Sequence, residues 1–163
     1  MGQGRARTTV PTLNRSPKVD IGSHTIPVLS VSPTQSDHTI LERLLPEPQW
    51  SVSRARGVVS ALTLLLQLRP VPVVLWEDFR PGAWRDLLVH TALLPDPPSI
   101  VVASRLADDR LWAEALNLGA YDVLAKPFEV AELTRTLRLA WLHSQHQRVA
   151  SDVAPRIAKA FTA

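Results

Sequence analysis

Two segments of the chain each join an apolar run to charged residues and then to a proline. The first segment, Val73–Gly82, carries Glu77 and Asp78, and the second, Gly119–Phe128, carries Lys126. Each pattern predicts a strand that ends at its charged residues, and in open parallel sheets ligands bind at the carboxyl ends of the strands. A carboxylate and an ammonium group brought together there can form an ion pair. They also supply two requirements of phosphoryl transfer, a nucleophile and a positive charge.

The elements that must position these residues alternate between strand and helix. The predicted strands are Ile26–Val31, Trp50–Ser53, Val71–Trp76, Ser99–Ala103 and Tyr121–Ala125. The predicted helices begin at Ser36 or Asp37, at Gly57, after Gly82, at Asp108 or Asp109, and after Pro127. Short connections and right-handed crossovers then predict an α/β fold, a doubly wound five-stranded parallel sheet flanked by helices in three layers.

Length and composition suit one globular domain with tails. The chain has 163 residues, 45% of them hydrophobic, and no cysteine, so neither a disulfide framework nor a cysteine zinc site is available. We expect a flexible or disordered arm at 1–25, a domain at 26–145, and a tail or helix extension at 146–163. The arm has no apolar signal segment, and the run Val58–Leu68 is shorter than the ~20 residues that span a bilayer. We therefore expect a cytoplasmic protein with no membrane partner.

The basic character of the chain is spread over its two ends. The formal net charge is +3 and the isoelectric point is about 9.9. The excess lies in the two terminal segments, and no basic helix with interleaved aromatics is present. We expect no nucleic-acid partner, although an adaptor that binds nucleic acid through its basic arms remains an alternative.

Residues 26 to about 143 resemble a receiver domain of the two-component response regulators, of the chemotaxis-regulator type. The resemblance rests on the motif Gly119-Ala120-Tyr121-Asp122-Val123-Leu124-Ala125-Lys126-Pro127-Phe128, on the Pro81-Gly82 turn after a buried strand, and on the order of the five units. It implies a flavodoxin-like fold and a role in phosphorelay signal transduction. The partners that it implies are a histidine kinase or a downstream target.

The match departs from the family at the phosphorylation site. Glu77 stands at the position of the phosphoacceptor aspartate, and the paired acids that hold magnesium fall on Ser32 and Pro33. Because Mg²⁺ requires oxygen ligands, usually carboxylates, we predict that the Mg²⁺ site is lost and that the protein has no cofactor.

The rest of the switch is only partly kept. Lys126 matches the family's lysine. The position of the family's threonine or serine falls on Ser104 or on Ala103, depending on the direction in which the chain is counted, and we prefer Ser104. Val123 replaces the switch aromatic. Tyr121 lies two residues earlier and is expected on the same strand face.

These departures predict a non-enzymatic, stand-alone signalling module that works by protein binding, independently of phosphorylation. Glu77 either mimics the activated state, with charge −1 against about −1.5 to −2 for a phosphate, or is inert. The alternative is a working phosphoacceptor that uses Glu77 or Asp78. Asp78 is the weaker candidate, because neighbouring strand residues point to opposite faces.

Apolar residues outside the inward stripe of the last helix predict a protein interface. They are Leu139, Trp141 and Leu142. The resemblance implies that the last two helices and the fifth strand form the binding surface, so we also expect Tyr121 in the interface and a possible homodimer through this surface. His143 and His146 are spaced like metal ligands, but no third ligand is in view, and we expect a solvated pair and no metal. We expect Trp50, Trp84, Trp112 and Trp141 to be buried or half-buried.

Overall fold

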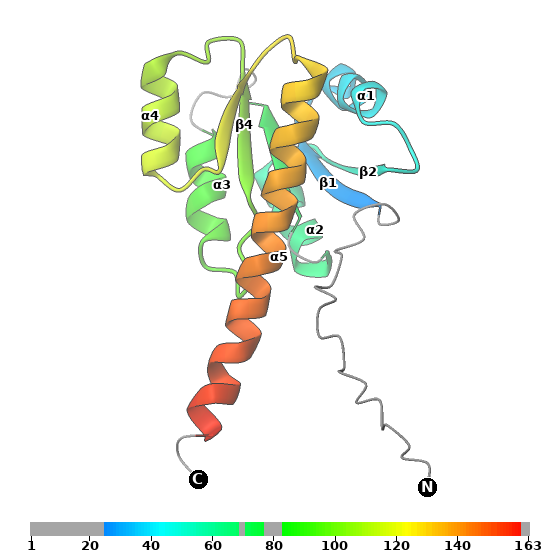
Figure 1. The fold of residues 1–163 in the computed structure, drawn as a ribbon. Coiled ribbons are helices and arrows are strands. Elements are labelled where there is room, and N and C mark those ends of the chain that lie inside the picture. Colours follow the sequence, from blue (N-terminus) through cyan, green and yellow to red (C-terminus); the bar gives the residue numbers. More distant parts are fainter. Residues whose placement is uncertain (1–24, 69–70, 77–82, 161–163) are drawn as a thin grey trace, which may run out of the picture.

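The protein folds as a parallel sheet between two layers of helices (Figure 1). The computed structural model describes residues 25–68, 71–76 and 83–160, with side chains up to residue 150. The strands are β1 (Ile26–Val31), β2 (Trp50–Ala55), β3 (Val73–Trp76), β4 (Ile100–Ser104) and β5 (Asp122–Ala125). The helices are α1 (Gln35–Leu44), α2 (Val58–Gln67), α3 (Ala83–Thr91), α4 (Asp109–Asn117) and α5 (Val130–Ala160). All neighbouring strands are parallel, in the order β2-β1-β3-β4-β5, which confirms the predicted doubly wound fold.

Each face of the sheet has its own hydrophobic core. Helices α2, α3 and α4 cover one face, where Val73 and Leu75 point. Helices α1 and α5 cover the other face, where Val74 and Trp76 point. The central strands β3 and β4 are buried at every position, and their sequences VVLW and IVVAS are almost entirely apolar for that reason. The unbroken apolar run of β3 follows from its place between β1 and β4.

The start of α1 differs from the prediction. Thr34 is the N-cap, and its side chain makes no capping hydrogen bond, so neither Ser36 nor Asp37 caps this helix. Instead the Ser32 hydroxyl accepts a bond from the Thr34 N–H (3.1 Å) and donates one to the Asp37 carboxylate (2.5 Å). The Asp37 charge also lies in the first turn, where the helix dipole favours an anion.

Helix α5 runs through the predicted domain boundary at residue 145 and ends at Ala160. Its first half lies across the sheet, and its second half extends beyond the body of the domain (Figure 1). The Ser99 hydroxyl, just before β4, donates to the Ala140 carbonyl (3.1 Å) and contacts the Ser144 hydroxyl (2.9 Å). These buried contacts attach the helix to the sheet.

Not every apolar residue expected inside is buried. Trp50 and Trp84 are fully buried and Trp141 is half-buried, but Trp112 is 49% exposed. Trp112 follows the inward-facing Leu111 by one residue, which is a rotation of about 100° around the helix, so it points away from the sheet. Within the described residues no helix is long and apolar enough to cross a membrane.

Candidate functional site

The carboxyl ends of β3, β4 and β5 bring the predicted crevice residues to one edge of the sheet. Ser104 is the last residue of β4 and pairs in register with Ala125 of β5, next to Lys126. The Lys126 N–H donates to the Ser104 carbonyl (3.0 Å). The Lys126 ammonium lies 4.6 Å from the ring centre of Trp76, the last residue of β3. Such a contact between a cation and an indole stabilises by ~0.5–1 kcal/mol at exposed sites and by more when desolvated.

Glu77, Asp78 and the Pro81-Gly82 turn lie outside the residues that the structure describes. Their pairing with Lys126 and their roles as acceptors therefore stay predictions. The described part of the crevice consists of the ends of β1, β3, β4 and β5, helix α1 and the segment after β5.

The Ser104 hydroxyl is fixed by a local turn. Ser104 is buried, and its hydroxyl oxygen accepts a hydrogen bond from the Leu106 N–H (3.0 Å). Ala103, the alternative in the count, points into the α1–α5 core and has no hydroxyl. Of the two candidates, only Ser104 brings a polar side chain to this edge of the sheet.

The positions of the expected metal ligands have a different use here. Ser32 is fully buried, and its hydroxyl is engaged by Thr34 and Asp37 as described above, while Pro33 is exposed and offers no side-chain ligand. No group of three His, Cys, Asp or Glu side chains that could hold a metal exists among the described residues. Glu77 and Asp78 lie outside the described residues, so the loss of the Mg²⁺ site stays a prediction.

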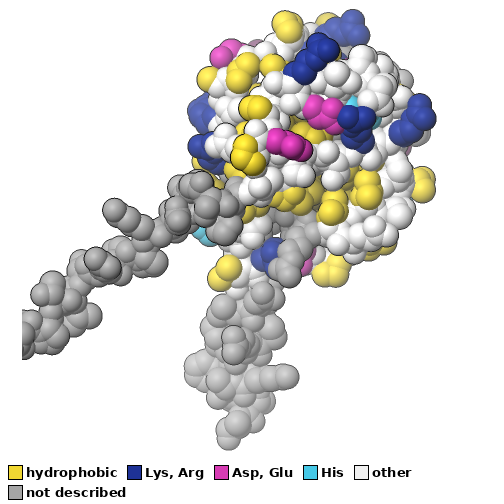
Figure 2. Space-filling model, turned by 90° about the vertical axis from the view of Figure 1, so that its right-hand side faces the viewer, with side chains coloured by type: hydrophobic (Ala, Val, Ile, Leu, Met, Phe, Trp, Pro, Cys, Tyr) yellow, Lys and Arg dark blue, Asp and Glu magenta, His cyan; other side chains and the backbone are white. Residues whose placement is uncertain are grey.

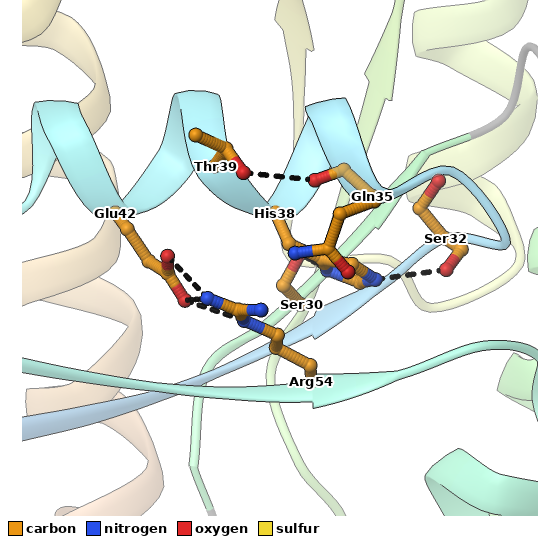
Figure 3. Close-up of polar contacts among 7 residues, drawn as sticks. All are labelled: Ser30, Ser32, Gln35, His38, Thr39, Glu42 and Arg54. Carbon is orange, nitrogen blue, oxygen red and sulfur yellow. Dashed lines mark hydrogen bonds and ion pairs between the residues drawn. The ribbon is translucent and has the colours of Figure 1, made fainter.

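A buried histidine that the sequence analysis missed organises this end of β1 (Figure 3). His38 of α1 is 2% exposed, with Nδ1 2.8 Å from the Ser30 hydroxyl and Nε2 2.9 Å from the Ser32 carbonyl oxygen. A carbonyl can only accept, so Nε2 carries the proton, and in the neutral ring Nδ1 accepts from Ser30. The indole N–H of Trp76 also donates to the Ser30 hydroxyl (3.3 Å). These bonds link α1 to the end of β3.

The sequence did carry a signal for this histidine. His38, Leu41 and Leu45 are spaced by three and four residues, which places them on one helical face. Leu41 and Leu45 are both buried in the α1–α5 core. A histidine on that stripe has to be buried and must therefore find hydrogen-bond partners.

An open pocket of about 590 Å³ occupies this edge of the sheet. Helix α1 forms one wall, the segment after β5 forms another, and Trp76 contributes at the end of β3. The lining residues are Ser36, Asp37, Ile40, Leu44, Trp76, Arg105, Lys126, Pro127 and Phe128. The pocket thus joins an apolar surface to a few charged groups.

Val123 and Tyr121 do not share a face, contrary to the prediction. Val123 is buried in the core under α2, α3 and α4, whereas Tyr121 packs against the α1–α5 core, with its ring centre 5.5 Å from that of His143. The reason is that β5 begins only at Asp122, so the alternation of strand side chains does not extend back to Tyr121. Burial, together with the charge of Asp122, raises the pKa of Tyr121.

The predicted interface residues differ in exposure. Leu139 is 48% exposed, while Tyr121, Trp141 and Leu142 are half-buried. Trp141 packs partly against the α1–α5 core, and Leu139, two residues earlier, lies on a different side of the helix. His143 is exposed, with Nε2 2.9 Å from the Gln147 amide nitrogen.

Charges of both signs are interspersed on the face that Figure 2 presents, with hydrophobic side chains between them. Two exposed ion pairs tie elements together: Glu42 of α1 to Arg54 of β2, and Arg85 of α3 to Glu114 of α4. The first pair is visible in Figure 3.

Comparison with known proteins supports the fold. No protein-family model and no curated protein matches the chain, but many solved structures do. The chemotaxis response regulator CheY4 of Vibrio cholerae superposes with a TM-score of 0.62 at 18% identity, covering 72% of this chain and 99% of CheY4. The signal receiver domain of an HD domain-containing protein from Pseudomonas fluorescens Pf-5 gives 0.65 at 24% identity, covering 76% and 99%. The response regulator StyR gives 0.72 at 19% identity, covering 86% and 71%.

These structural neighbours are receiver domains of response regulators. Identities below 25% establish a shared fold, the five-stranded parallel sheet with its flanking helices. They leave the chemistry of the crevice to be argued from this chain's own residues.

Proposed function

We propose that this chain is a degenerate receiver domain that acts in signal transduction by binding other proteins, without enzymatic activity and without a metal cofactor. The observation that carries the proposal is the arrangement at the end of β1. There Ser32 is buried and hydrogen-bonded through its hydroxyl to Asp37 and through its carbonyl to His38. Pro33 is exposed next to it.

The arrangement supports a lost metal site for an electrostatic reason. A magnesium ion gives up water only for oxygen ligands in near-octahedral geometry, usually carboxylates. The Ser32 hydroxyl is neutral and already has a donor and an acceptor partner, and Pro33 has no side-chain ligand atom. Without the ion, a transferred phosphoryl group would lose the largest positive charge that stabilises its transition state.

Lys126 then has a different role from that in a working receiver. Its ammonium rests on the indole of Trp76, which is hydrogen-bonded to Ser30 and through it to His38. We propose that this set of contacts holds the crevice in one state that does not depend on a signal. Glu77 would either add a fixed negative charge to that state or take no part in it.

The binding surface is proposed on α4, β5 and α5. Three apolar side chains there are about half exposed: Trp112 in α4, Leu118 at the end of α4 and Leu139 in α5. Exposed apolar side chains that gather into one patch mark protein interfaces, and we propose that these three contribute to such a patch. The proposed partners are a histidine kinase, a downstream target or a second copy of the chain.

One observation favours the alternative, a working phosphoacceptor. Asp37 lines the pocket together with Lys126, so a carboxylate is present near the crevice, although not at the position that the family pattern predicts. If its hydrogen bond from Ser32 opened, it could join Glu77 or Asp78 around a divalent ion.

Incubation with acetyl phosphate and Mg²⁺, followed by intact-protein mass spectrometry, distinguishes the two functions. We expect no phosphoryl adduct on the native chain, and none on Lys126→Met, which serves as the matched control for the crevice. A stoichiometric adduct that disappears in Glu77→Gln or in Asp78→Asn would refute the proposal and identify the acceptor.

A further inference from the structure

A second cavity lies at the opposite, amino edge of the sheet. Helices α2 and α3 end just before β3 and β4 begin, so their C-terminal ends lie at the edge where β1 starts (Figure 1). The ends of these two helices line a cavity of about 270 Å³, to which α5 contributes one residue. The lining is mainly aliphatic and consists of Leu65, Leu66, Leu68, Leu94 and Pro95, together with Asp96 and, from α5, Arg148.

The lining of this cavity suits apolar side chains. Leu65 is nearly buried in the core, whereas Leu66 is 73% exposed, so part of the aliphatic lining is open to water. Covering such a surface is favourable because it removes apolar groups from water. The volume is slightly below the ~300–1,000 Å³ of small-molecule pockets. An extended chain segment that inserts one or two side chains therefore fits the cavity better than a small molecule does.

The N-terminal arm joins the domain at the same edge. Residues 1–24 lie outside the described residues, and Thr25 directly precedes β1. β1 lies beside β3, and the Leu29 N–H donates to the Pro72 carbonyl (3.0 Å), four residues after the lining residue Leu68. Neighbouring strands are ~4.8 Å apart and packed layers ~10 Å apart, which places the start of the arm roughly 15 Å from the cavity.

The arm contains a segment whose pattern fits an apolar cavity, Val10-Pro11-Thr12-Leu13. A proline favours extended backbone at its own position and at the residue before it. The polyproline II helix has three residues per turn, so it places Val10 and Leu13 on one side, ~9 Å apart along its axis. Val19 and Ile21 are two residues apart and do not share a side in this way.

The linker between this segment and the domain has a suitable length. About twelve residues lead from Leu13 to Thr25, and a flexible linker of that length has a root-mean-square reach of ~17–21 Å. A tethered segment acts at its highest effective concentration, in the millimolar range, when this reach matches the span. A weak apolar contact is then populated within one chain, whereas a separate protein making the same contact would need to be present at that concentration. The tether thus favours the chain's own arm as the occupant.

We infer that the N-terminal arm docks on its own domain, with Val10 and Leu13 seated on Leu66, Leu68 and Leu94. The inference goes beyond the proposed function and does not depend on it, because neither the crevice nor a signalling partner enters the argument.

A spin label on the arm tests where this segment lies. The chain has no cysteine, so a nitroxide attached to Thr12→Cys in the full chain is the only label. We expect it to broaden the amide NMR signals of Leu66, Leu68 and Leu94 and not that of Leu106, which follows β4 at the carboxyl edge. Broadening should be absent when the spin-labelled chain is mixed with an unlabelled, ¹⁵N-enriched chain, because the arm docks on its own domain.

Two pairs of matched variants in the spin-labelled chain identify the contact. We expect Val10→Ser with Leu13→Ser to lower the ratio of docked to free arm about tenfold or more, through lost apolar burial. Val19→Ser with Ile21→Ser should leave the ratio unchanged. On the domain, Leu66→Ser should lower it about tenfold, and Val59→Ser, 79% exposed on the same helix but outside the cavity, should not.

Three results would overturn the inference. The first is an absence of broadening at the lining residues, or equal broadening at Leu106. The second is broadening that arises only in the mixture, which would assign the cavity to the arm of a second copy. The third is an equal docked ratio in Leu66→Ser and Val59→Ser, or in the two arm variants.

Discussion

Replacing His38 with phenylalanine keeps a ring of similar size in the α1–α5 core but removes both of its hydrogen bonds. The Ser30 hydroxyl loses the acceptor for its proton, and the Ser32 carbonyl loses the Nε2–H donor. Both groups are 0% exposed at the residue level, so water cannot easily replace the lost partner.

The expected loss of stability follows from these two groups. A buried polar group left without its partner costs ~1–3 kcal/mol. Burial of the more apolar phenylalanine ring recovers a part of this. We therefore expect His38→Phe to lower the free energy of unfolding by about 2–4 kcal/mol, a large fraction of the ~5–15 kcal/mol typical of a domain.

Urea denaturation followed by circular dichroism measures this difference, provided that the slope of the transition is unchanged. His146→Phe is the matched control, because it makes the same chemical change at an exposed site of α5 and should shift stability by no more than ~0.5 kcal/mol. A loss below ~1 kcal/mol in His38→Phe would show that the two buried bonds do not organise the end of β1.

The remaining predictions concern β5 and α5. Tyr121 is the only tyrosine of the chain, so its titration can be followed directly by tyrosinate absorbance. We expect a midpoint above the ordinary value of 10.0, because burial and then the Asp122 charge raise the pKa, and Asp122→Asn should lower that midpoint. The pKa of Tyr121 is higher in the folded than in the unfolded chain, so the folded chain holds the phenol proton more tightly. The stabilisation from this proton is therefore present below pH 10.0 and is lost as the pH rises through the folded-state pKa. Tyr121→Phe should therefore reduce the fall in stability above pH 10.0, and an equal fall in both proteins would contradict the assignment. On α5, Leu137 is fully buried and Leu139 is 48% exposed. Leu137→Ala should therefore lower the free energy of unfolding by about 2–5 kcal/mol, and Leu139→Ala by no more than ~0.5 kcal/mol. Equal losses of stability in thermal or urea unfolding would show that the inward face of α5 is misassigned.

The fold could be predicted because its signals are local and agree with one another. The apolar run at β3 indicates a strand buried on both sides, and Asp108 marks a helix start that the structure confirms, its carboxylate accepting a bond from the Leu111 N–H (2.8 Å). Gly119 marks the helix end, with a positive φ of 99° that favours glycine. Signals of this kind depend on a few neighbouring residues only.

The site was harder to predict because its contacts join distant parts of the chain. Ser30 and Trp76 are 46 residues apart, and nothing near either residue indicates their hydrogen bond. His38 was missed because a histidine is polar and does not by itself indicate burial; only its spacing to Leu41 and Leu45 does. Tyr121 was assigned to the wrong face because the prediction extended β5 by one residue. That residue lies before the ladder begins, where side chains no longer alternate.

The length of α5 has a mechanical consequence. Arg148 of α5 lines a pocket with Leu65 and Leu68 of α2 and its end, and the helix continues from there to Ala160. At a rise of 1.5 Å per residue, the segment after Arg148 forms an arm about 18 Å long, and a tilt of about 10° at its base would move its tip by about 3 Å. A small rotation of α5 where it meets the sheet would therefore move any molecule bound at the tip of the helix by about the size of an atom.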